Sequence, residues 1–561
     1  MSWMIKDCDT DRKANLESDG VLDFFATILA NRDNAVTNKK DIVAHVNGSV
    51  KEIDDPYDLE NMQKAVELLK STGGKALVFG DYDVDGVTST FMARKALRAL
   101  GYDDVKSFIP KRNRDGYGLN DKSVGNFMEI TVGMEFDMFV ILDCGSSSNK
   151  HIKEIRKNWP EAKVVIFDHH LIEDDTFSSD ADAVVNPRMG GKHPFCTGGL
   201  MLQLARALFD KEECMEYYPY GALATVADVC TLQGSNRMIV KAGLEVIRRK
   251  CDMGLSKLFE VQGKDMKKCS SEDIGFAIAP MINAAGRISD ATIALKALEE
   301  TDEEKAEELA QELFALNKHR KDIQAEIFLK VEETIGGSIG NRKSILIHGD
   351  WNPGVVGIIA GQLADRYSCP VLCLGRGPDG SIKGSARSRT GINVKEVMDD
   401  CKQIFLRYGG HEQAAGATLN PDYADTAWDL FDQSVKKHMA KKGMDSIPIM
   451  YDVEISDRLL AKMNDGFCER LEAFAPFGNG NSRPVIRANG VKCKRVHEWS
   501  SGKGGFVHLD KISLDTFAMV PKVKEKLDGK RLDILFTIER SFMKEGGWAV
   551  RIQNAKLSDK L

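Results

Sequence analysis

The sequence lacks the features of a secreted or membrane protein. No segment is long and apolar enough to span a bilayer. The first residues, Met1 to Asp7, do not combine a basic region with an apolar stretch as a secretory signal does. The twelve cysteines are scattered singly, without a Cys-x-x-Cys pair, so we interpret them as reduced thiols and not as zinc ligands. These absences favour a cytoplasmic protein that does not bind a membrane.

The sequence also lacks the net positive charge that many nucleic-acid-binding proteins carry. The formal net charge of the 561 residues is −7. The charges are unevenly distributed, because residues 485–561 hold 16 Lys and Arg against 9 Asp and Glu, which leaves −14 on the residues before them. A basic terminal domain on an acidic body is compatible with nucleic-acid binding. A solvated surface would have the same composition.

Three aspartates crowd into the heptapeptide GDYDVDG at residues 80–86. The apolar run before it predicts a buried parallel strand, and ligands of open α/β sheets bind beyond the carboxyl ends of such strands. Asp81, Asp83 and Asp85 would repel one another there unless a cation neutralised them. A hard divalent metal prefers oxygen ligands of this kind. A solvated acidic turn has the same composition, so the heptapeptide alone leaves both interpretations open.

Later acidic positions favour the metal. Asp143 follows a second apolar strand pattern. Asp168, His169 and His170 follow a third. Asp228 comes after an apolar helical run. Imidazole beside carboxylates suits Mn²⁺ or a similar ion, and acids seldom recur by chance at the ends of successive strands. The pattern therefore predicts a metal site.

These residues also carry a family resemblance. The segments GDYDVDG (80–86), LDCG (142–145), DHH (168–170) and ATVADV (224–229) resemble the motifs of the DHH phosphoesterase superfamily. The fit is best with its RecJ family of single-strand-specific DNA exonucleases. Matching segments continue in order along residues 50–561: INAAGR (282–287), NPGVVGIIA (352–360), GSARS (384–388), GGHEQAAG (409–416) and PFGNGN (476–481).

The resemblance implies a set of metal-binding and catalytic residues. The expected ligands are Asp83, Asp85, Asp143, His169 and Asp228. Asp143 would bridge the two ions. Asp143 and His170 are the expected catalytic residues. Asp81 is a further candidate ligand. Phe79 stands where several relatives carry a histidine, so whether Asp81 binds directly stays open. His170 would contact or protonate the scissile phosphate, and Asp168 would orient its neighbours.

The second half of the chain supplies candidate phosphate contacts. In Gly384–Ser388, small residues would let backbone N–H groups approach a phosphate while Arg387 offers a bidentate fork. Gly409–His411 would repeat this arrangement, with glycines before a helix start that favours anions. Arg112 and Arg114 could line the path of the strand or simply be surface charges. The predicted substrate-binding residues are Asn283, Arg287, Ser385, Arg387, Ser388, Gly409, Gly410 and His411.

Length and periodicity predict an α/β fold with several domains. Apolar strands alternate with helical stretches in the first half, and Glu303 to about Ile335 predicts one long helix. We expect an N-terminal lead-in (1–50), a DHH catalytic domain (51–300), a linker helix (301–335), a DHHA1-like domain that binds phosphate or DNA (336–440) and a nucleic-acid-binding domain (441–561). The resemblance implies that the last is an OB-like β-barrel.

The expected function is metal-dependent hydrolysis of phosphodiester bonds. Two Mn²⁺ or Mg²⁺ ions can stabilise the attacking and leaving oxygens of an in-line displacement at phosphorus. By resemblance, the chain would act as a monomer in DNA repair and recombination, degrading single-stranded DNA from its 5′ end to nucleoside 5′-phosphates. Candidate partners are a single-strand-binding protein and a helicase. Two alternatives stay open: hydrolysis of oligoribonucleotides or cyclic dinucleotides, and a metal-free scaffold in a replication or repair assembly.

Overall fold

Two compact units make up the chain. The smaller comprises Met1–Ile53, Val229–Lys241 and Pro448–Leu561, and the larger comprises Asp54–Asp228 and Ala242–Ile447. The computed structural model describes residues 3–32, 36–190, 195–336, 339–377, 380–389, 391–443, 448–460, 463–498, 504–509, 513–517, 529–540 and 548–558. In this part of the chain, no helix is both long and apolar enough to cross a membrane.

A five-stranded parallel sheet forms the first half of the larger unit, in the strand order β3-β2-β4-β5-β6. Its strands are β2 (Lys75–Phe79), β3 (Asp104–Phe108), β4 (Met138–Leu142), β5 (Lys163–Phe167) and β6 (Ala183–Val185). All five residues of β4 are buried, as expected when helices cover both faces of a parallel sheet.

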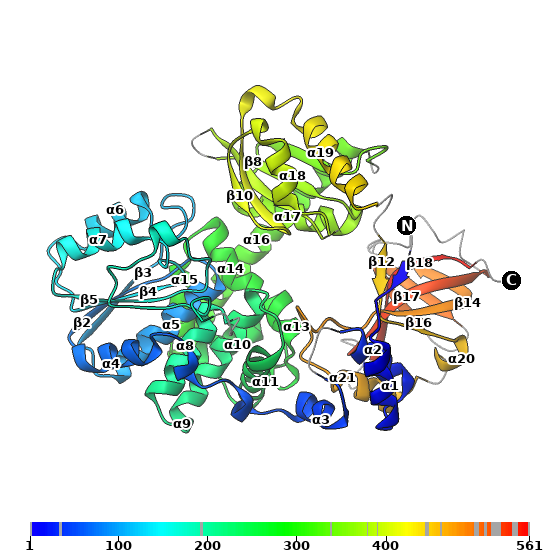
Figure 1. Ribbon diagram of the computed structural model, residues 1–561, viewed down its shortest axis with the longest axis horizontal. Coiled ribbons are helices and arrows are strands. Elements are labelled where there is room, and N and C mark those ends of the chain that lie inside the picture. The colour runs from blue at the N-terminus through cyan, green and yellow to red at the C-terminus, as the bar shows by residue number, and fades with distance from the viewer. Residues whose placement is uncertain are drawn as a thin grey trace. The chain divides into compact units, whose positions relative to one another are not determined.

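Figure 1 shows helices on both faces of this sheet. On one face lie α6 (Asp121–Ile130) and α7 (Asn149–Asn158), and on the other α4 (Met62–Thr72), α5 (Val84–Ala99) and α8 (Thr197–Leu208). The aromatic rings of Phe79, Phe108 and Phe127 meet in the core beneath α6. Phe79 therefore points into this core.

A helical layer follows the parallel sheet. Its helices are α9 (Lys211–Cys214), α10 (Tyr218–Ala227), α11 (Gly234–Arg249), α12 (Met253–Val261), α13 (Ser271–Asp273), α14 (Ala279–Ile288) and α15 (Thr292–Glu299). The part of α11 up to Lys241 belongs to the smaller unit. The long helix α16 spans Glu303–Ile335, which confirms the helix predicted from the sequence. The Asp302 side chain caps its first turn, and Gly336 ends it with a φ of 65°, a conformation that favours glycine.

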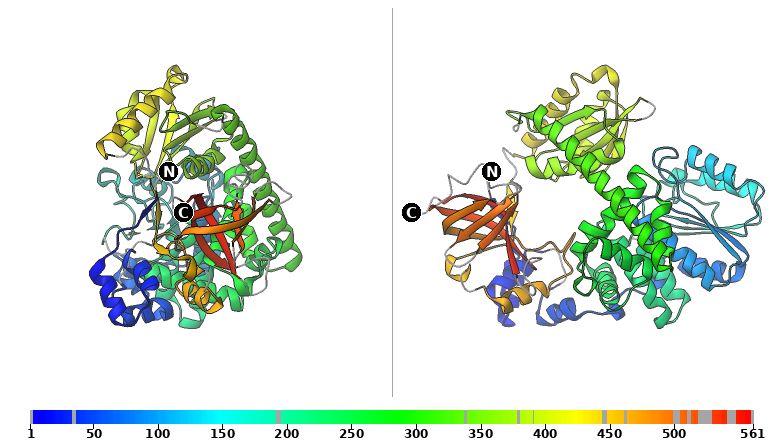
Figure 2. Two further views of the ribbon diagram at one scale, coloured as in Figure 1. Left: turned by 90° about the vertical axis from the view of Figure 1, so that its right-hand side faces the viewer. Right: turned by 180° about the vertical axis from the view of Figure 1, so that it is seen from behind.

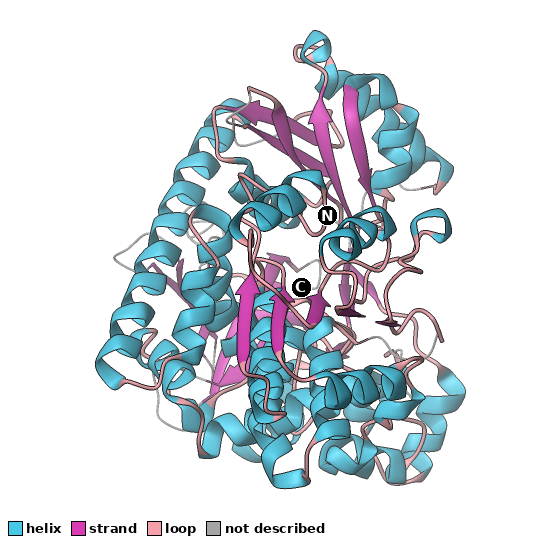
Figure 3. Cartoon of the chain, turned by 90° about the vertical axis from the view of Figure 1, so that its left-hand side faces the viewer, coloured by secondary structure: helices cyan, strands magenta, loops and turns pink. Residues whose placement is uncertain are grey.

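A mixed sheet forms the second half of the larger unit, in the order β10-β11-β9-β8-β7. Its strands are β7 (Ile345–Gly349), β8 (Val371–Arg376), β9 (Ile382–Arg387), β10 (Phe405–Gly410) and β11 (Ala414–Leu419). Helices lie on both sides of it (Figures 2 and 3). One core packs α16 and α17 (Pro353–Tyr367) against the sheet, and the other packs α18 (Val394–Asp400) and α19 (Ala427–Lys441).

The smaller unit joins the two ends of the chain. Its strands are β1 (Trp3–Ile5), β12 (Ile449–Tyr451), β13 (Val453–Ile455), β14 (Ile486–Glu498), β15 (Gly504–Leu509), β16 (Ser513–Phe517), β17 (Arg531–Arg540) and β18 (Trp548–Leu557). Its helices are α1 (Thr10–Ser18), α2 (Asp23–Ala30), α3 (Lys39–Asn47), α20 (Asp457–Leu460) and α21 (Asp465–Glu472).

One hydrophobic core holds the two ends of the chain together in this unit. Phe24 of α2 packs on Phe467 of α21, with ring centroids 4.9 Å apart. Strand β1 pairs in parallel with β12. The larger sheet of the unit is mixed, in the order β13-β14-β15-β16-β18-β17, and β17 also pairs with β14. A closed OB-like barrel stays a prediction.

Candidate metal centre

The predicted metal ligands of the parallel sheet lie at the carboxyl ends of three neighbouring strands. Asp81 follows β2, Asp143 follows β4 and His169 follows β5. Because the sheet order places β2, β4 and β5 side by side, these loops converge at one edge of the sheet. Asp228 reaches the same place from the carboxyl end of α10. The convergence predicted from the sequence is confirmed.

The side chains form three groups that could each hold a metal ion. Within each group, one ligand atom per residue lies within 4.8 Å of the others. The groups are Asp85, His169 and Asp228; Asp81, Asp83 and Asp143; and Asp143, His169 and His170. All six predicted ligands take part. Asp143 and His169 each belong to two of the groups, and the role of Asp143 as a bridge stays a prediction.

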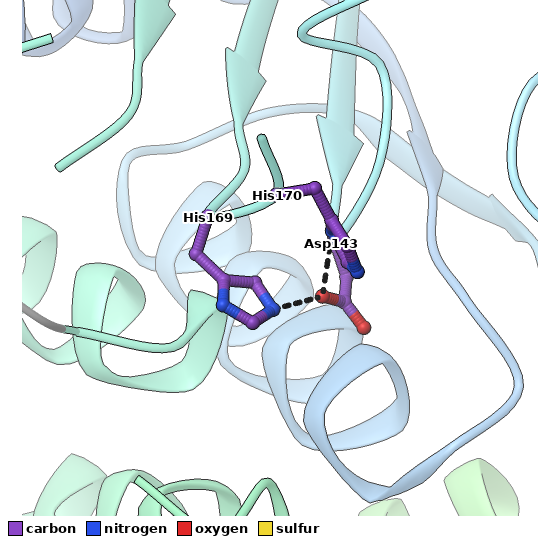
Figure 4. Close-up of side chains that lie close together, drawn as sticks. All are labelled: Asp143, His169 and His170. Atoms are coloured by element: carbon purple, nitrogen blue, oxygen red, sulfur yellow. Dashed lines mark ion pairs between the residues drawn. The ribbon is translucent and has the colours of Figure 1, made fainter. Parts of the chain in front are cut away.

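His169 lies at the centre of these contacts. Its Nε2 atom is 3.3 Å from Asp143 Oδ1 and 3.7 Å from Asp85 Oδ2, and its Nδ1 atom is 3.8 Å from Asp228 Oδ2. His170 Nδ1 lies 4.0 Å from the same Asp143 oxygen. Figure 4 shows both imidazoles directed at this carboxylate. A single carboxylate between two imidazoles is a suitable bridge between two cations.

Backbone N–H groups hold two of the aspartates in place. Asp83 caps α5, with its side chain accepting a hydrogen bond from Gly86 N at 3.1 Å. Asp85 accepts from Thr197 N at 2.8 Å and from Gly198 N at 2.6 Å, at the first turn of α8. A helix N-terminus stabilises such an anion. Thr197 and Gly198 were not predicted from the sequence, where their only signal is a Thr-Gly-Gly triplet before an apolar helical run.

Crowding of negative charge dominates the electrostatics of the centre. Asp81 and Asp143 are 1% and 2% exposed. Burial and the neighbouring carboxylates, Asp83 for Asp81 and Asp85 for Asp143, raise the pKa of both groups well above their usual range. Asp81 Oδ1 is buried and has no hydrogen-bond partner among the described residues. An orphaned carboxylate oxygen among like charges fits a divalent cation, so the residues suit the predicted Mn²⁺ or Mg²⁺.

Asp168 and Tyr117 hold His170 from either side. Burial opposes the ionisation of Asp168, but the hydrogen bond from His170 and those from the backbone prevail and lower the pKa of Asp168 to about 2. Burial likewise opposes protonation of His170, and the 2.8 Å hydrogen bond to Asp168 prevails, so the pKa of His170 is raised. The Tyr117 hydroxyl lies 2.9 Å from His170 Nε2 and donates to the Asp143 carbonyl. No role for Tyr117 was predicted from the sequence.

A cavity of about 230 Å³ lies beside the aspartates. It is lined by Asp81, Tyr82, Asp83, Arg112, Tyr117, Asn283, Gly286 and Arg287. The Arg112 guanidinium lies 4.8 Å from the centre of the Tyr82 ring. Burial, together with Arg112, lowers the pKa of Arg287 to about 10. Two cations next to the metal ligands suit a phosphate group.

Arg112, Asn283 and Arg287 therefore lie beside the aspartates, and their contact with a substrate stays a prediction. Arg114 pairs instead with Asp115, at 2.6 Å, and does not line the cavity.

Arg387 connects to this cavity through α17. Arg287 Nη1 donates to the Gly354 carbonyl at 3.1 Å, in the first turn of α17. One turn later, a Cβ on Gly357 would lie 3.5 Å from Arg387 Nη2. Arg387 donates to the Ser385 hydroxyl and to its own strand at Ala386 O. The two predicted substrate contacts Ser385 and Arg387 therefore lie together, and their binding of a substrate stays a prediction.

Two details of the predicted phosphate contacts are wrong. Gly384–Arg387 lies within β9, between β11 and β8, so ladder pairing on both sides occupies its backbone. Gly409 and Gly410 end β10, and Ala414 begins β11. Here His411 N donates to Ala414 O, and the segment is a hairpin with no helix start. Ladder pairing with β11 overrides the glycine-then-helix pattern. Ser388 and His411 lie at this end of the sheet, where Ala414 pairs with Arg387.

Comparison with known proteins places the chain in a family. Residues 75–229 match the DHH family, N-terminal domain, and residues 327–437 match the DHHA1 domain. A single-stranded-DNA-specific exonuclease RecJ from Dickeya dadantii is 30% identical over 459 residues, which cover 76% of this chain and 78% of the relative. The RecJ of Salmonella typhimurium is 33% identical over 397 residues, covering 64% and 67%. The chain belongs to the RecJ family.

The chain spans only part of the length of some of its RecJ relatives. The RecJ of Bacillus subtilis is 30% identical over 519 residues, which are 90% of this chain but only 63% of the relative. A crystal structure of RecJ from Thermus thermophilus with Mn²⁺ matches the fold over the whole chain and 80% of its own, with a TM-score of 0.78 and 24% identity. A second structure, an exonuclease RecJ bound to manganese, matches 68% of this chain and 95% of its own, with a TM-score of 0.56 and 31% identity.

Proposed function

We propose that this RecJ-family chain hydrolyses the phosphodiester bonds of single-stranded DNA from the 5′ end, releasing nucleoside 5′-phosphates. The observation that carries the proposal is the pair of ligand groups that Asp143 and His169 connect, next to a cavity lined by Arg112 and Arg287. The preference for single-stranded DNA rests on the names of its relatives. The direction of cleavage rests on the family resemblance alone.

The metal centre would contain two divalent ions. Asp85, His169 and Asp228 would hold one, Asp81, Asp83 and Asp143 the other, with Asp143 between them. Bound ions of this kind stabilise the attacking and leaving oxygens of a displacement at phosphorus. Whether Asp81 binds directly stays open, and its orphaned Oδ1 favours direct binding.

The other residues of the site position the substrate and a proton. Arg112, Asn283 and Arg287 would take a phosphate in the cavity. Arg387, in contact with α17, would continue this grip along the strand, with Ser385, Ser388, Gly409, Gly410 and His411 at the same end of its sheet. His170 carries a raised pKa and lies 4.0 Å from Asp143, so it is placed to donate a proton to the phosphate or its leaving group.

The smaller unit would hold the incoming strand. The strand pairing β14-β15-β16-β18-β17, with β17 paired to β14 again, supports an OB-like barrel, a fold that binds single strands. The net charge of +7 in residues 485–561 favours a polyanion. The five-part domain division, action as a monomer, a cytoplasmic location, a role in repair and recombination, and a single-strand-binding protein or helicase as partner stay predictions.

Digestion of end-labelled oligonucleotides tests the proposal. Single strands labelled at the 5′ or the 3′ end would be incubated with Mn²⁺ or Mg²⁺, beside a blunt duplex and a dinucleotide. We expect immediate release of a labelled mononucleotide from the 5′-labelled strand, with slow cleavage of the duplex. A dinucleotide cleaved faster than the long strand would support the phosphodiesterase alternative, and no metal-dependent cleavage of any substrate would support the scaffold.

A further inference from the structure

The chain passes from one compact unit to the other directly after a metal ligand. Asp228 is the last residue of its segment of the larger unit, and Val229 is the first of a segment that belongs to the smaller one. The Asp228 side chain is 30% exposed, whereas those of Asp85 and Asp143 are 2% and 3% exposed. Burial therefore restrains the Asp228 side chain less than those of these two ligands. The position of its carboxylate depends more on the path of its backbone.

The backbone turns sharply at Val229. Its φ is 57°, in the left-handed region that a β-branched residue rarely adopts. The residue is 64% exposed, so packing does not compensate for this conformation. Some other contact must hold the turn. If Val229 moved to a more favourable φ, the Asp228 side chain would point in another direction.

The loop of residues 474–481, which includes the PFGNGN motif, makes that contact. Asn479 Nδ2 donates to the Val229 carbonyl at 2.8 Å, and Asn479 O accepts from Leu232 N at 2.8 Å. Two glycines allow this approach. A Cβ on Gly478 would lie 2.7 Å from Leu232 Cδ1, and one on Gly480 would lie 2.4 Å from Thr231 Cγ2. Asn479 thus binds the segment at both sides of the turn.

A buried arginine fixes the loop itself. Arg237, 1% exposed, donates to the carbonyls of Phe474, Ala475 and Pro476 at 2.7–3.3 Å. Arg237 lies in α11, eight residues after Val229. The loop and the segment 229–237 therefore form one hydrogen-bonded body within the smaller unit, and the carbonyl of Val229 is tied to it.

We propose that Asn479 is a positioning residue for the metal ligand Asp228. By holding the left-handed turn at Val229, it sets the direction in which the Asp228 carboxylate leaves the backbone. The inference rests on the metal centre of the proposed function and adds to it a role for the smaller unit, which supplies no ligand of its own to that centre among the described residues.

Metal binding without DNA tests this role. Mn²⁺ would be titrated into the chelator-stripped full-length protein by calorimetry, for the wild type and for Asn479→Ala, Asp228→Asn and Asn464→Ala. Asn464 is the matched control, because its side chain also makes one hydrogen bond to the backbone of the smaller unit, accepting from Phe467 N at 3.0 Å in α21. Loss of one hydrogen bond predicts a binding event weakened about 3- to 10-fold in Asn479→Ala. Asp228→Asn should weaken the same event further, and Asn464→Ala should not change it.

A second substitution tests whether the turn transmits the effect. Glycine adopts a φ of 57° without steric cost, so Val229→Gly in the Asn479→Ala background should restore Mn²⁺ binding. Wild-type Mn²⁺ binding by Asn479→Ala alongside a weakened Asp228→Asn, or no recovery in the double variant, would overturn the inference and leave the proposed function intact. Wild-type binding by both Asp228→Asn and Asn479→Ala would overturn the assignment of Asp228 as a ligand, and the inference with it.

Discussion

The two sheets of the larger unit carry their functional residues in different ways. In the parallel sheet, the ligands lie in the loops and the first turn of α5 beyond the carboxyl ends of β2, β4 and β5, where three chain segments meet. In the mixed sheet, Arg387 is the last residue of the central strand β9, and its neighbours come from a hairpin. Loops with free backbone groups can surround an ion, whereas a paired strand offers only its side chains. The first sheet therefore suits metal binding and the second suits a charged grip on a substrate.

Removal of the metal should reduce nuclease activity the most, because hydrolysis depends on the metal centre. It should affect only the parallel sheet, which carries that centre. We expect protein stripped by a chelator to lose all nuclease activity and to recover it with Mn²⁺. Bound metal should also raise the unfolding temperature, since a ligand at 100 times its Kd adds about 2.7 kcal/mol to the free energy of unfolding. Scanning calorimetry with and without Mn²⁺ measures this shift, and full activity in the chelated protein would contradict the assignment.

Asp143→Ala should come next, since this carboxylate belongs to two of the ligand groups. We expect activity to fall ~10³-fold or more, which corresponds to about 4 kcal/mol of activation free energy. Single-turnover digestion of a labelled strand measures it. Asp137→Asn is the control, because Asp137 sits at the other end of the same strand, where it accepts from Lys75 N. Equal losses in both variants would point to damaged folding of the sheet.

Arg387→Ala tests the mixed sheet alone. Loss of a charge-assisted contact to phosphate predicts a KM for single-stranded DNA raised ~10- to 100-fold, with Mn²⁺ binding unchanged. Arg389→Ala is the matched control, because Arg389 is mostly exposed and pairs with Asp365 at 3.1 Å. Steady-state kinetics on strands of increasing length would show the difference. An unchanged KM in Arg387→Ala would remove the mixed sheet from the substrate path.

Two glycine substitutions test the hairpin and should have the smallest effect. Gly410 has a φ of 145°, and a Cβ there would lie 2.4 Å from Ala415 Cα, whereas Gly409 has open space around it. Gly410→Ala should reduce the free energy of unfolding by about 1–3 kcal/mol, and Gly409→Ala should change it little. Urea unfolding compares them. Equal stability of the two variants would argue against the hairpin geometry.

The sequence predicted the metal centre better than it predicted the phosphate contacts, for a physical reason. Asp81, Asp143 and His169 each follow a short apolar strand, and parallel order alone brings such ends together. The hairpin at residues 405–419 depends on pairing between β10 and β11, and a glycine pair followed by alanines gives no sign of it. Tyr117 and Thr197 were missed because their roles arise only from contacts with Asp143 and Asp85.

Long-range packing was equally invisible in the sequence. The long helix α16 was predicted from its composition, because its signals are local. Nothing local indicates that Phe24 packs on Phe467, or that Arg237 binds the loop at Phe474. Such contacts join segments far apart along the chain, and periodicity carries no information about them.

Crystals grown with Mn²⁺ would test the central claim most directly. An anomalous difference map should show two peaks at the carboxyl edge of the parallel sheet. One should lie among Asp85, His169 and Asp228, and the other among Asp81, Asp83 and Asp143, with an Asp143 oxygen within bonding distance of both. A single peak, or peaks away from these side chains, would contradict the two-metal centre.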